Sequence, residues 1–270
     1  VAVPGIAANL RHFAIVDPWP RVAVGQFAMN ADPTYANGEL WYTALTDSGY
    51  RTRSAHGGSI GPADADSFHP TAGGKGEVWI ETVRRRSQIF EYANYGAGPA
   101  KYVTDGASPV VSPDERWLAF LRDDGSQAQL WIRSLADGSE FPVRLPGYEI
   151  LEASLSQAEV VFAAQRGLEI SLFRQALCPA AGPQPILTGR VRYPAISPDR
   201  RHLAFSRWSR GTWHLWIRNL PTGEGRQMTF ADCNAVTPAW SDDGRTLFYA
   251  SDCGRLGLTT LRAIPVVPAQ

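Results

Sequence analysis

The stretch Pro194-Ala195-Ile196-Ser197-Pro198-Asp199 is followed by His202-Leu203-Ala204-Phe205 and then by Leu215-Trp216-Ile217-Arg218-Asn219-Leu220. Proline presets φ at the second position of a turn, and the flanking Ser and Asp side chains can bond back to turn amides. The apolar runs are short, rich in β-branched and aromatic residues, and bounded by turn-forming residues, which is typical of strands. This stretch therefore predicts a hairpin followed by a third strand.

The same pattern recurs along the chain. Close copies begin at Pro109-Val110-Val111-Ser112-Pro113-Asp114 and Pro238-Ala239-Trp240-Ser241-Asp242-Asp243, and weaker copies fill the remaining length. One apolar position, assigned to the third strand, repeats at intervals of about 42 residues: Leu40, Ile89, Leu130, Leu172, Leu215 and Leu258. A period of this length, built from short strands, is typical of a β-propeller with one four-stranded blade per repeat.

The prediction is therefore an all-β chain that forms one domain over residues 1–270, a six-bladed β-propeller of four-stranded antiparallel blades. The expected blades are residues 10–55, 64–104, 107–145, 149–188, 192–229 and 234–262. The last blade has only three strands by residue 262, and an unpaired final edge would be exposed. We expect residues 1–8 to supply its outer strand.

The combination of Pro-x-x-Ser-Pro-Asp, Leu-Ala-Phe and Leu-Trp-Ile resembles the WD-repeat-like propeller repeat of the TolB family. The resemblance covers residues 64–262 and is clearest in the third, fifth and sixth repeats. It implies a six-bladed propeller outside the cytoplasm, in the periplasm or at the cell surface of a bacterium, that acts by binding another protein. The alternative is a substrate-gating or recognition module of a larger enzyme, as in the prolyl oligopeptidase group.

Composition narrows the choice of partner. The 26 basic and 26 acidic residues cancel, whereas binders of nucleic acid or anionic membranes need an excess of Lys and Arg. No apolar run approaches the ~20 residues that a bilayer requires, so we expect no membrane insertion by this chain. Eight arginines but only Asp199 and Glu224 fall within residues 190–230, a local basic sector that is either a solvated rim or a site for acidic groups.

No catalytic residue, metal site or cofactor is predicted. Gly57-Gly58-Ser59-Ile60-Gly61 has the string of a nucleophile elbow, but that motif requires a following helix and a strand is expected here. Gly96-Ala97-Gly98-Pro99-Ala100-Lys101 lacks the ending of a phosphate loop. No histidine is spaced with another residue as metal ligands are. Asp64 and Asp66 could line the channel or bind a cation, but solvated loop acids are the simpler interpretation.

Two cysteines flank the predicted hairpin of the sixth blade. Cys233 and Cys253 lie ten residues on either side of Asp243, so in an antiparallel pair they face each other at a distance that a disulfide can bridge. Such a bridge indicates an oxidising compartment; two reduced thiols in the core are the alternative. Cys178 is left without a partner.

The candidate protein-binding residues are Arg207, Trp208 and Arg210. The hairpins of the third and fifth blades have equal length, and Trp208 falls at a tip where the third blade carries ordinary solvated residues. Trp and Arg often carry interface energy, because they combine apolar area with directed hydrogen bonds. Packing of Trp208 over the rim of a neighbouring blade is the alternative.

Overall fold

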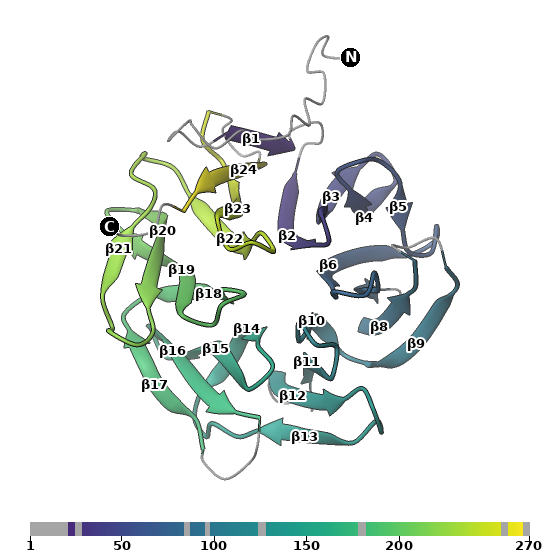
Figure 1. Ribbon diagram of the computed structural model, residues 1–270, viewed down its shortest axis with the longest axis horizontal. Helices are drawn as coiled ribbons and strands as arrows, with labels where there is room; N and C mark the ends of the chain where they lie inside the picture. The colour runs from purple at the N-terminus through teal and green to yellow at the C-terminus, as the bar shows by residue number, and fades with distance from the viewer. Residues whose placement is uncertain are drawn as a thin grey trace.

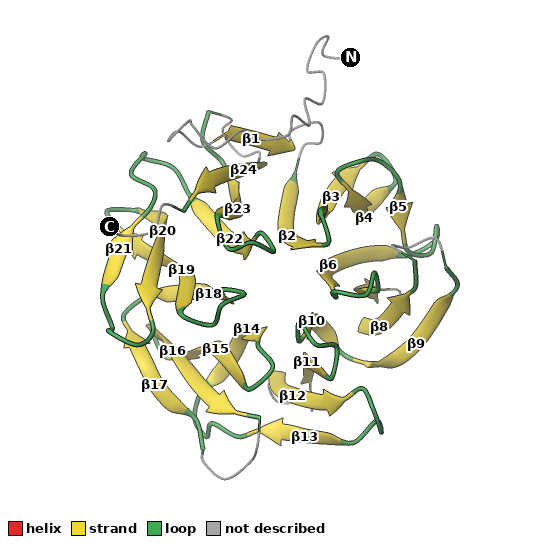
Figure 2. Ribbon diagram, in the orientation of Figure 1, coloured by secondary structure: helices red, strands yellow, loops and turns green. Residues whose placement is uncertain are grey.

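The computed structural model describes residues 21–24, 29–83, 87–94, 98–123, 128–177, 182–254 and 259–266. The described strands form six separate four-stranded antiparallel sheets arranged in a ring around a central channel (Figure 1). No helix is present among the described residues (Figure 2). The predicted all-β, six-bladed propeller is confirmed.

The first three blades follow one another along the chain. Blade one comprises β2 (Asn30–Ala36), β3 (Glu39–Thr46), β4 (Gly49–Ser54) and β5 (Ser59–Ile60). Blade two comprises β6 (Asp66–Ala72), β7 (Val78–Val83), β8 (Ser87–Tyr92) and β9 (Ala100–Asp105). Blade three comprises β10 (Ala107–Val111), β11 (Trp117–Asp123), β12 (Ala128–Ser134) and β13 (Glu140–Val143).

The other three blades complete the ring (Figure 1). Blade four comprises β14 (Glu149–Leu155), β15 (Glu159–Arg166), β16 (Glu169–Ala176) and β17 (Gln184–Thr188). Blade five comprises β18 (Val191–Ile196), β19 (His202–Ser209), β20 (Thr212–Asn219) and β21 (Gly225–Gln227). Blade six comprises β22 (Ala235–Trp240), β23 (Thr246–Ser251), β24 (Thr260–Pro265) and β1 (Arg21–Val24).

The outer strand of blade six comes from the start of the chain, but not from the expected segment. Strand β1 pairs antiparallel with β24, with Arg21 opposite Ala263 and Val22 opposite Arg262. Residues 1–8, which were expected there, lie outside the described residues. A segment from before blade one does complete blade six, but it is Arg21–Val24 rather than residues 1–8. The repeat period could not locate this strand, because the strand carries no copy of the repeated motif.

One anchor of the repeat was also misplaced. Leu40 lies on β3, the second strand of blade one, and the third strand is β4, where Thr52 faces Thr43 of β3. Thr52 is polar and buried, so the apolar signal of the third strand is missing there. The other described anchors do lie on third strands: Ile89, Leu130, Leu172 and Leu215. Leu258 lies outside the described residues.

The hydrophobic core is divided among the seams between blades. One cluster joins Leu40 and Tyr42 of blade one to Phe248 and Leu261 of blade six, so the closing seam is packed like the others. Both faces of a blade are covered by its neighbours, which explains why the second strands are continuous apolar runs rather than alternating ones. Leu203-Ala204-Phe205 of β19 is buried throughout.

The Ser-Pro-Asp turns close the first hairpin of their blades in the predicted manner. The Ser197 hydroxyl donates to Asp199 and accepts the backbone N–H of His202 at 2.9 Å. Ser112 and Ser241 accept the N–H groups of Trp117 and Thr246 in the same way. These buried hydroxyls satisfy amides that the tight turn would otherwise leave unpaired.

Each inner strand contains a β-bulge near its beginning. In five blades a residue with φ between 47° and 55° precedes a proline at the bulge: Asp32, His69, Ser108, Tyr193 and Thr237. The inner strand is a sheet edge, where proline is tolerated, and a bulge redirects a side chain. We call the end of the propeller where the inner strands begin the entry face, and the opposite end the exit face.

Candidate binding face at the mouth of the channel

The hairpin between β19 and β20 projects on the entry face. Ser209 pairs with Thr212, which leaves Arg210 and Gly211 as a two-residue turn with φ of 53° and 92°. Positive φ at both positions is the geometry of a type I′ turn, whose twist matches that of the flanking strands. The turn places Trp208 directly opposite Trp213 on the neighbouring strand.

Three aromatic rings run from this hairpin toward the channel. Trp208 and Trp213 meet edge to face with ring centroids 5.4 Å apart, and Trp213 meets Tyr193 at 6.4 Å. The Arg192 guanidinium lies 4.6 Å from the Tyr193 ring centroid. Edge-to-face pairs are each worth ≈ 0.5–1.5 kcal/mol beyond the area that they bury. The row therefore holds Trp208 in a defined position at the tip.

A carboxylate of the preceding blade fixes the inner end of this row. Glu152 of β14 accepts hydrogen bonds from Nε and Nη2 of Arg192, the shortest at 2.7 Å, and accepts the backbone N–H of Tyr193 at 2.8 Å. Burial raises the pKa of Tyr193, as do the charges of Glu152 and Asp32, whereas Arg192 opposes the rise. At neutral pH the ring is therefore a neutral phenol beside an ion pair.

A second charged group lies on the entry face between blades one and two. His69 Nδ1 is 2.9 Å from Glu81, and its Nε2 is 3.8 Å from Asp32. Burial alone would lower the pKa of His69, but the Asp32 charge and the hydrogen bond to Glu81 outweigh it and raise that pKa to about 9. His69 is thus a cation at neutral pH, which makes it a link between blades rather than a proton acceptor.

The three predicted binding residues do not form one patch. Trp208 is half-buried against Trp213, and Arg210 is exposed in the turn, with no hydrogen bond or ion pair among the described residues. Arg207 lies 5.6 Å from the centroid of the Trp216 ring, and neighbouring strand residues point to opposite faces of a blade. Arg210 and Trp208 thus lie together at the tip, and Arg207 lies apart from them.

Sequence reasoning missed several members of the row. Its alternation with Leu215 and Ile217 favours a place for Trp213 in the blade interior, but the side chain is half-buried between Trp208 and Tyr193. Tyr193, Arg192 and Glu152 were not singled out. A proline near the start of the inner strand recurs in five blades. The position before this proline is the sequence signal that would have pointed to the mouth of the channel.

Three exposed apolar side chains from different parts of the ring lie on the same face. Four large apolar residues of the described chain are markedly exposed, among them Leu168 at 85% and Phe230 at 74%. Leu168 lies in the turn between β15 and β16, Phe230 in the segment between β21 and β22, and Met29 just before β2, all on the entry face. Tyr102, on the outer strand β9, is the fourth. Large apolar side chains exposed on one face make that face a candidate interaction surface.

The predicted disulfide lies next to this face. Cys233 and Cys253 are bonded, with their Cα atoms 5.2 Å apart, just beyond the pairing of Ala235 with Ser251. The intervening Asn234 accepts the backbone N–H of Trp213 at 3.0 Å. The disulfide therefore anchors Asn234, the residue that binds the backbone of Trp213 on β20. Cys178 lies outside the described residues.

The remaining motifs are structural where they are described. Ser59 and Ile60 form β5, after a turn and with no helix, and Gly98 precedes the outer strand β9. Asp66 accepts the backbone N–H of Tyr50 at 3.0 Å, and Asp64 also has a partner. Within the described ranges no three His, Cys, Asp or Glu residues are arranged to hold a metal ion, and no helix could cross a bilayer.

Solved structures with the same architecture include TolB from Acinetobacter baumannii, with a TM-score of 0.66 and 16% identity over 83% of this chain and 60% of that one. The chain has the fold of the TolB-like propellers. It spans about 60% of the length of that TolB. No family model and no curated protein sequence matches the chain.

Propellers of enzymes are also similar. Oligogalacturonate lyase from Vibrio parahaemolyticus superposes with a TM-score of 0.62 at 7% identity, over 85% of this chain and 75% of that one. A Mycobacterium tuberculosis puromycin-hydrolysing peptidase superposes at 0.63 with 14% identity, over 94% of this chain and 46% of that one. The fold is therefore shared by TolB and by enzymes, and function has to be argued from the site.

Proposed function

We propose that this propeller is a protein-interaction module whose entry face docks another protein outside the cytoplasm. The observation that carries the proposal is the placement of Trp208, Leu168, Phe230 and Met29 on one end of the ring. Trp208 is held by the ring of Trp213, so little conformational entropy remains to be lost on binding. Arg210 next to it, which has no hydrogen bond or ion pair among the described residues, supplies directed donors.

The location outside the cytoplasm is supported by the Cys233–Cys253 bridge. Disulfides persist in oxidising compartments and are rare in the cytosol of mesophiles. The likeness to TolB propellers points the same way.

A second candidate is a recognition module of a larger enzyme. Its support is the peptidase neighbour, of which this chain matches 46%. In that case the entry face would dock a catalytic domain of the same polypeptide. The sequence of the complete gene separates the two candidates, because only the second requires a hydrolase domain.

Affinity capture tests the proposed face. The intact chain, the Trp208→Ala variant and a Tyr102→Ala control are immobilised and exposed to an extract of the source cells. Tyr102 is also an exposed aromatic residue, but it lies on β9, away from the entry face. We expect a protein that the wild type and the control retain and the Trp208 variant loses. Identical retention by all three would overturn the proposal.

A further inference from the structure

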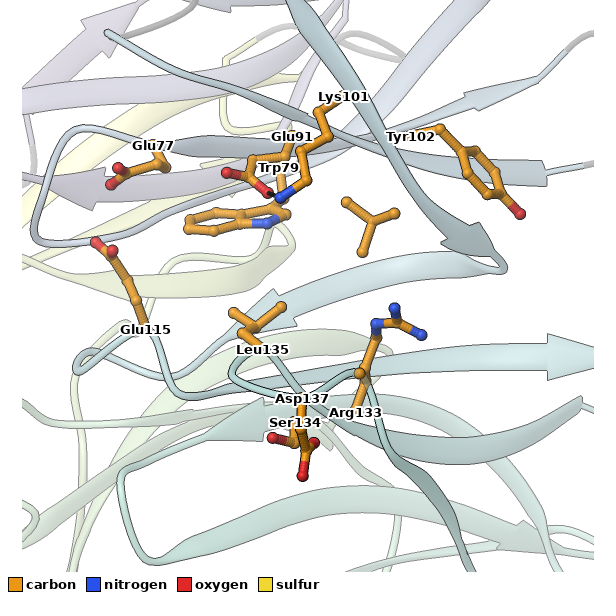
Figure 3. Close-up of a pocket in the computed structure, with 12 residues that line it drawn as sticks. Glu77, Trp79, Glu91, Lys101, Tyr102, Glu115, Arg133, Ser134, Leu135 and Asp137 are labelled. Atoms are coloured by element: carbon orange, nitrogen blue, oxygen red, sulfur yellow. Dashed lines mark hydrogen bonds and ion pairs between the residues drawn. The ribbon is translucent and has the colours of Figure 1, made fainter.

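A pocket of about 450 Å³ opens on the exit face between blades two and three (Figure 3). Blade two contributes the beginning of β7, the end of β8 and the beginning of β9, and blade three contributes its two turns on that face. The pocket lies at the opposite end of the propeller from Trp208, so it is separate from the proposed docking face.

One end of the pocket is acidic. The carboxyl groups of Glu77 and Glu115 face each other there, one from each blade (Figure 3). Glu115 accepts the backbone N–H of Lys75 at 2.6 Å and lies 3.3 Å from the Lys75 ammonium. Glu77 Oε2 is buried and has no hydrogen-bond partner among the described residues. A buried carboxylate oxygen without a donor costs free energy unless a ligand supplies one.

The middle of the pocket is apolar. Trp79 is 2% exposed, and its ring and the Leu135 side chain lie on facing sides of the pocket (Figure 3). Its indole N–H is buried and has no acceptor among the described residues. Val103 completes this wall. The wall thus offers an aromatic face, and Trp79 and Glu77 beside it each hold one buried polar atom without a hydrogen-bond partner among the described residues.

Both cations that line the pocket lie beside carboxylates, and Arg122 shares the Glu140 partner of Arg133. Lys101 lies 3.3 Å from Glu91, and Arg133 lies 2.7 Å from Glu140. Asp137 at the rim accepts hydrogen bonds from Ser139 and has a pKa lowered to about 2, so it is ionised at neutral pH. The carboxylates therefore remain in excess, and the field in the pocket favours a positively charged ligand.

We propose that this pocket binds a small organic cation, an alkyl ammonium or guanidinium group on a short apolar stem. The charged head would donate to Glu77 and Glu115, and the stem would lie against Trp79, Val103 and Leu135. A cation near an indole face gains further electrostatic attraction. The same head group is carried by a free amine and by a lysine or arginine side chain of a peptide.

Binding would be linked to protons. Burial raises the pKa of Glu77, and the Glu115 and Glu91 charges add to the rise. The other charged groups facing the site are Lys75, Lys101, Arg133 and Asp137. A cation would favour the ionised form of Glu77, so binding releases protons and affinity increases with pH across the Glu77 titration.

Calorimetric titration of the full chain with agmatine tests the proposal, with glutarate and 1-butanol as anionic and neutral probes. We expect agmatine alone to bind, one per chain, and Glu77→Gln to weaken it at least tenfold. Glu224→Gln is the matched control, because Glu224 lines a similar pocket between blades five and six. No binding of agmatine, or equal binding of glutarate or 1-butanol, would overturn the proposal. Equal weakening by both variants would do the same.

Two further arms complete the experiment. The capped peptide Ac-Ala-Arg-Ala-NH2 distinguishes a free amine from a basic side chain of a peptide as the source of the cation. Tighter binding than agmatine identifies the side chain, and weaker binding identifies the free amine. Either result supports a cation site. If Glu77→Gln does not fold, Glu115→Gln replaces it with the same expected loss. Trp208→Ala must leave agmatine binding unchanged, so that a failure of the docking proposal can be told apart from a failure of the pocket proposal. Loss of agmatine binding in this variant would contradict a pocket separate from the docking face.

Discussion

Arg21 pairs with Ala263 inside blade six, where a strand from before blade one completes the last sheet of the ring. The strand that completes blade six thus precedes the other five blades in sequence, so the first and last described strands hold each other. An exposed β24 edge would otherwise be available to other chains.

Deletion of residues 1–24 should therefore destabilise the whole ring. The β1–β24 hydrogen bonds disappear, each contributing on the order of 1 kcal/mol, so we expect a loss of about 3 kcal/mol in the free energy of unfolding. Urea denaturation measures it. Deletion of residues 1–20 is the control, since it leaves β1 in place; an equal loss there would show that the stabilising segment lies before Arg21.

Removal of the disulfide should cost a similar amount. Cys233 and Cys253 are 20 residues apart, and a loop of that size is worth about 3 kcal/mol in the chain-entropy model. We expect the double Cys→Ser variant to unfold at a correspondingly lower urea concentration. A thiol titration of the native wild type should find one free cysteine. Three free thiols would contradict the bridge.

The contribution of His69 to stability should depend on pH. Its pKa is about 9 in the folded protein and 6.5 ordinarily, so the folded state binds the proton more tightly. The stability difference between the wild type and His69→Gln is therefore largest below pH 6.5 and is lost as pH rises through 9. Urea midpoints from pH 6 to 10 measure this difference. A constant difference would show that Asp32 and Glu81 do not act on a charged His69.

The two tryptophans of the blade-five hairpin should be energetically coupled. A double-mutant cycle of Trp208→Ala and Trp213→Ala is expected to give a coupling of about 0.5–1.5 kcal/mol in unfolding free energy, as for other edge-to-face pairs. Trp208→Ala alone should lower the melting temperature only slightly, because Trp208 is half-exposed at the tip. A large loss would make Trp208 a core residue and remove it from the docking face.

The turn serines should be more important than their size suggests. Ser197→Ala leaves the buried N–H of His202 without its acceptor, at a cost of about 1–3 kcal/mol. Ser241→Ala should cost about the same, because Thr246 depends on it in the same way. Denaturation curves of both variants and of the double variant measure the losses, which should add. Strong non-additivity would indicate coupling between adjacent blades.

The sequence predicted the fold because a blade is locally encoded. Ser197-Pro198-Asp199 and the runs after it contain the turn, the strands and the apolar faces of one blade. The closure could not be located in the same way, since β1 carries no copy of the motif and is identified only by its pairing with β24.

The candidate site was predicted less well. Trp208 was recognisable because it replaces a solvated residue in an otherwise matched hairpin. The inner members of the row, Tyr193 and Glu152, come from other strands, and sequence spacing contains no information on contacts between distant strands. The Glu77–Glu115 pocket was missed for the same reason, because its two carboxylates belong to different blades.

The bulge before each inner-strand proline has a consequence for how this surface can change. Asp32, His69, Ser108, Tyr193 and Thr237 share one backbone geometry but carry an acid, an imidazole, a hydroxyl, a phenol and a second hydroxyl. The turn and the proline hold the position, so the side chain is not needed to maintain it. The five residues therefore occupy equivalent backbone positions in five of the inner strands. Exchanging one of them would change the chemical group presented there while the fold of the blade stays the same.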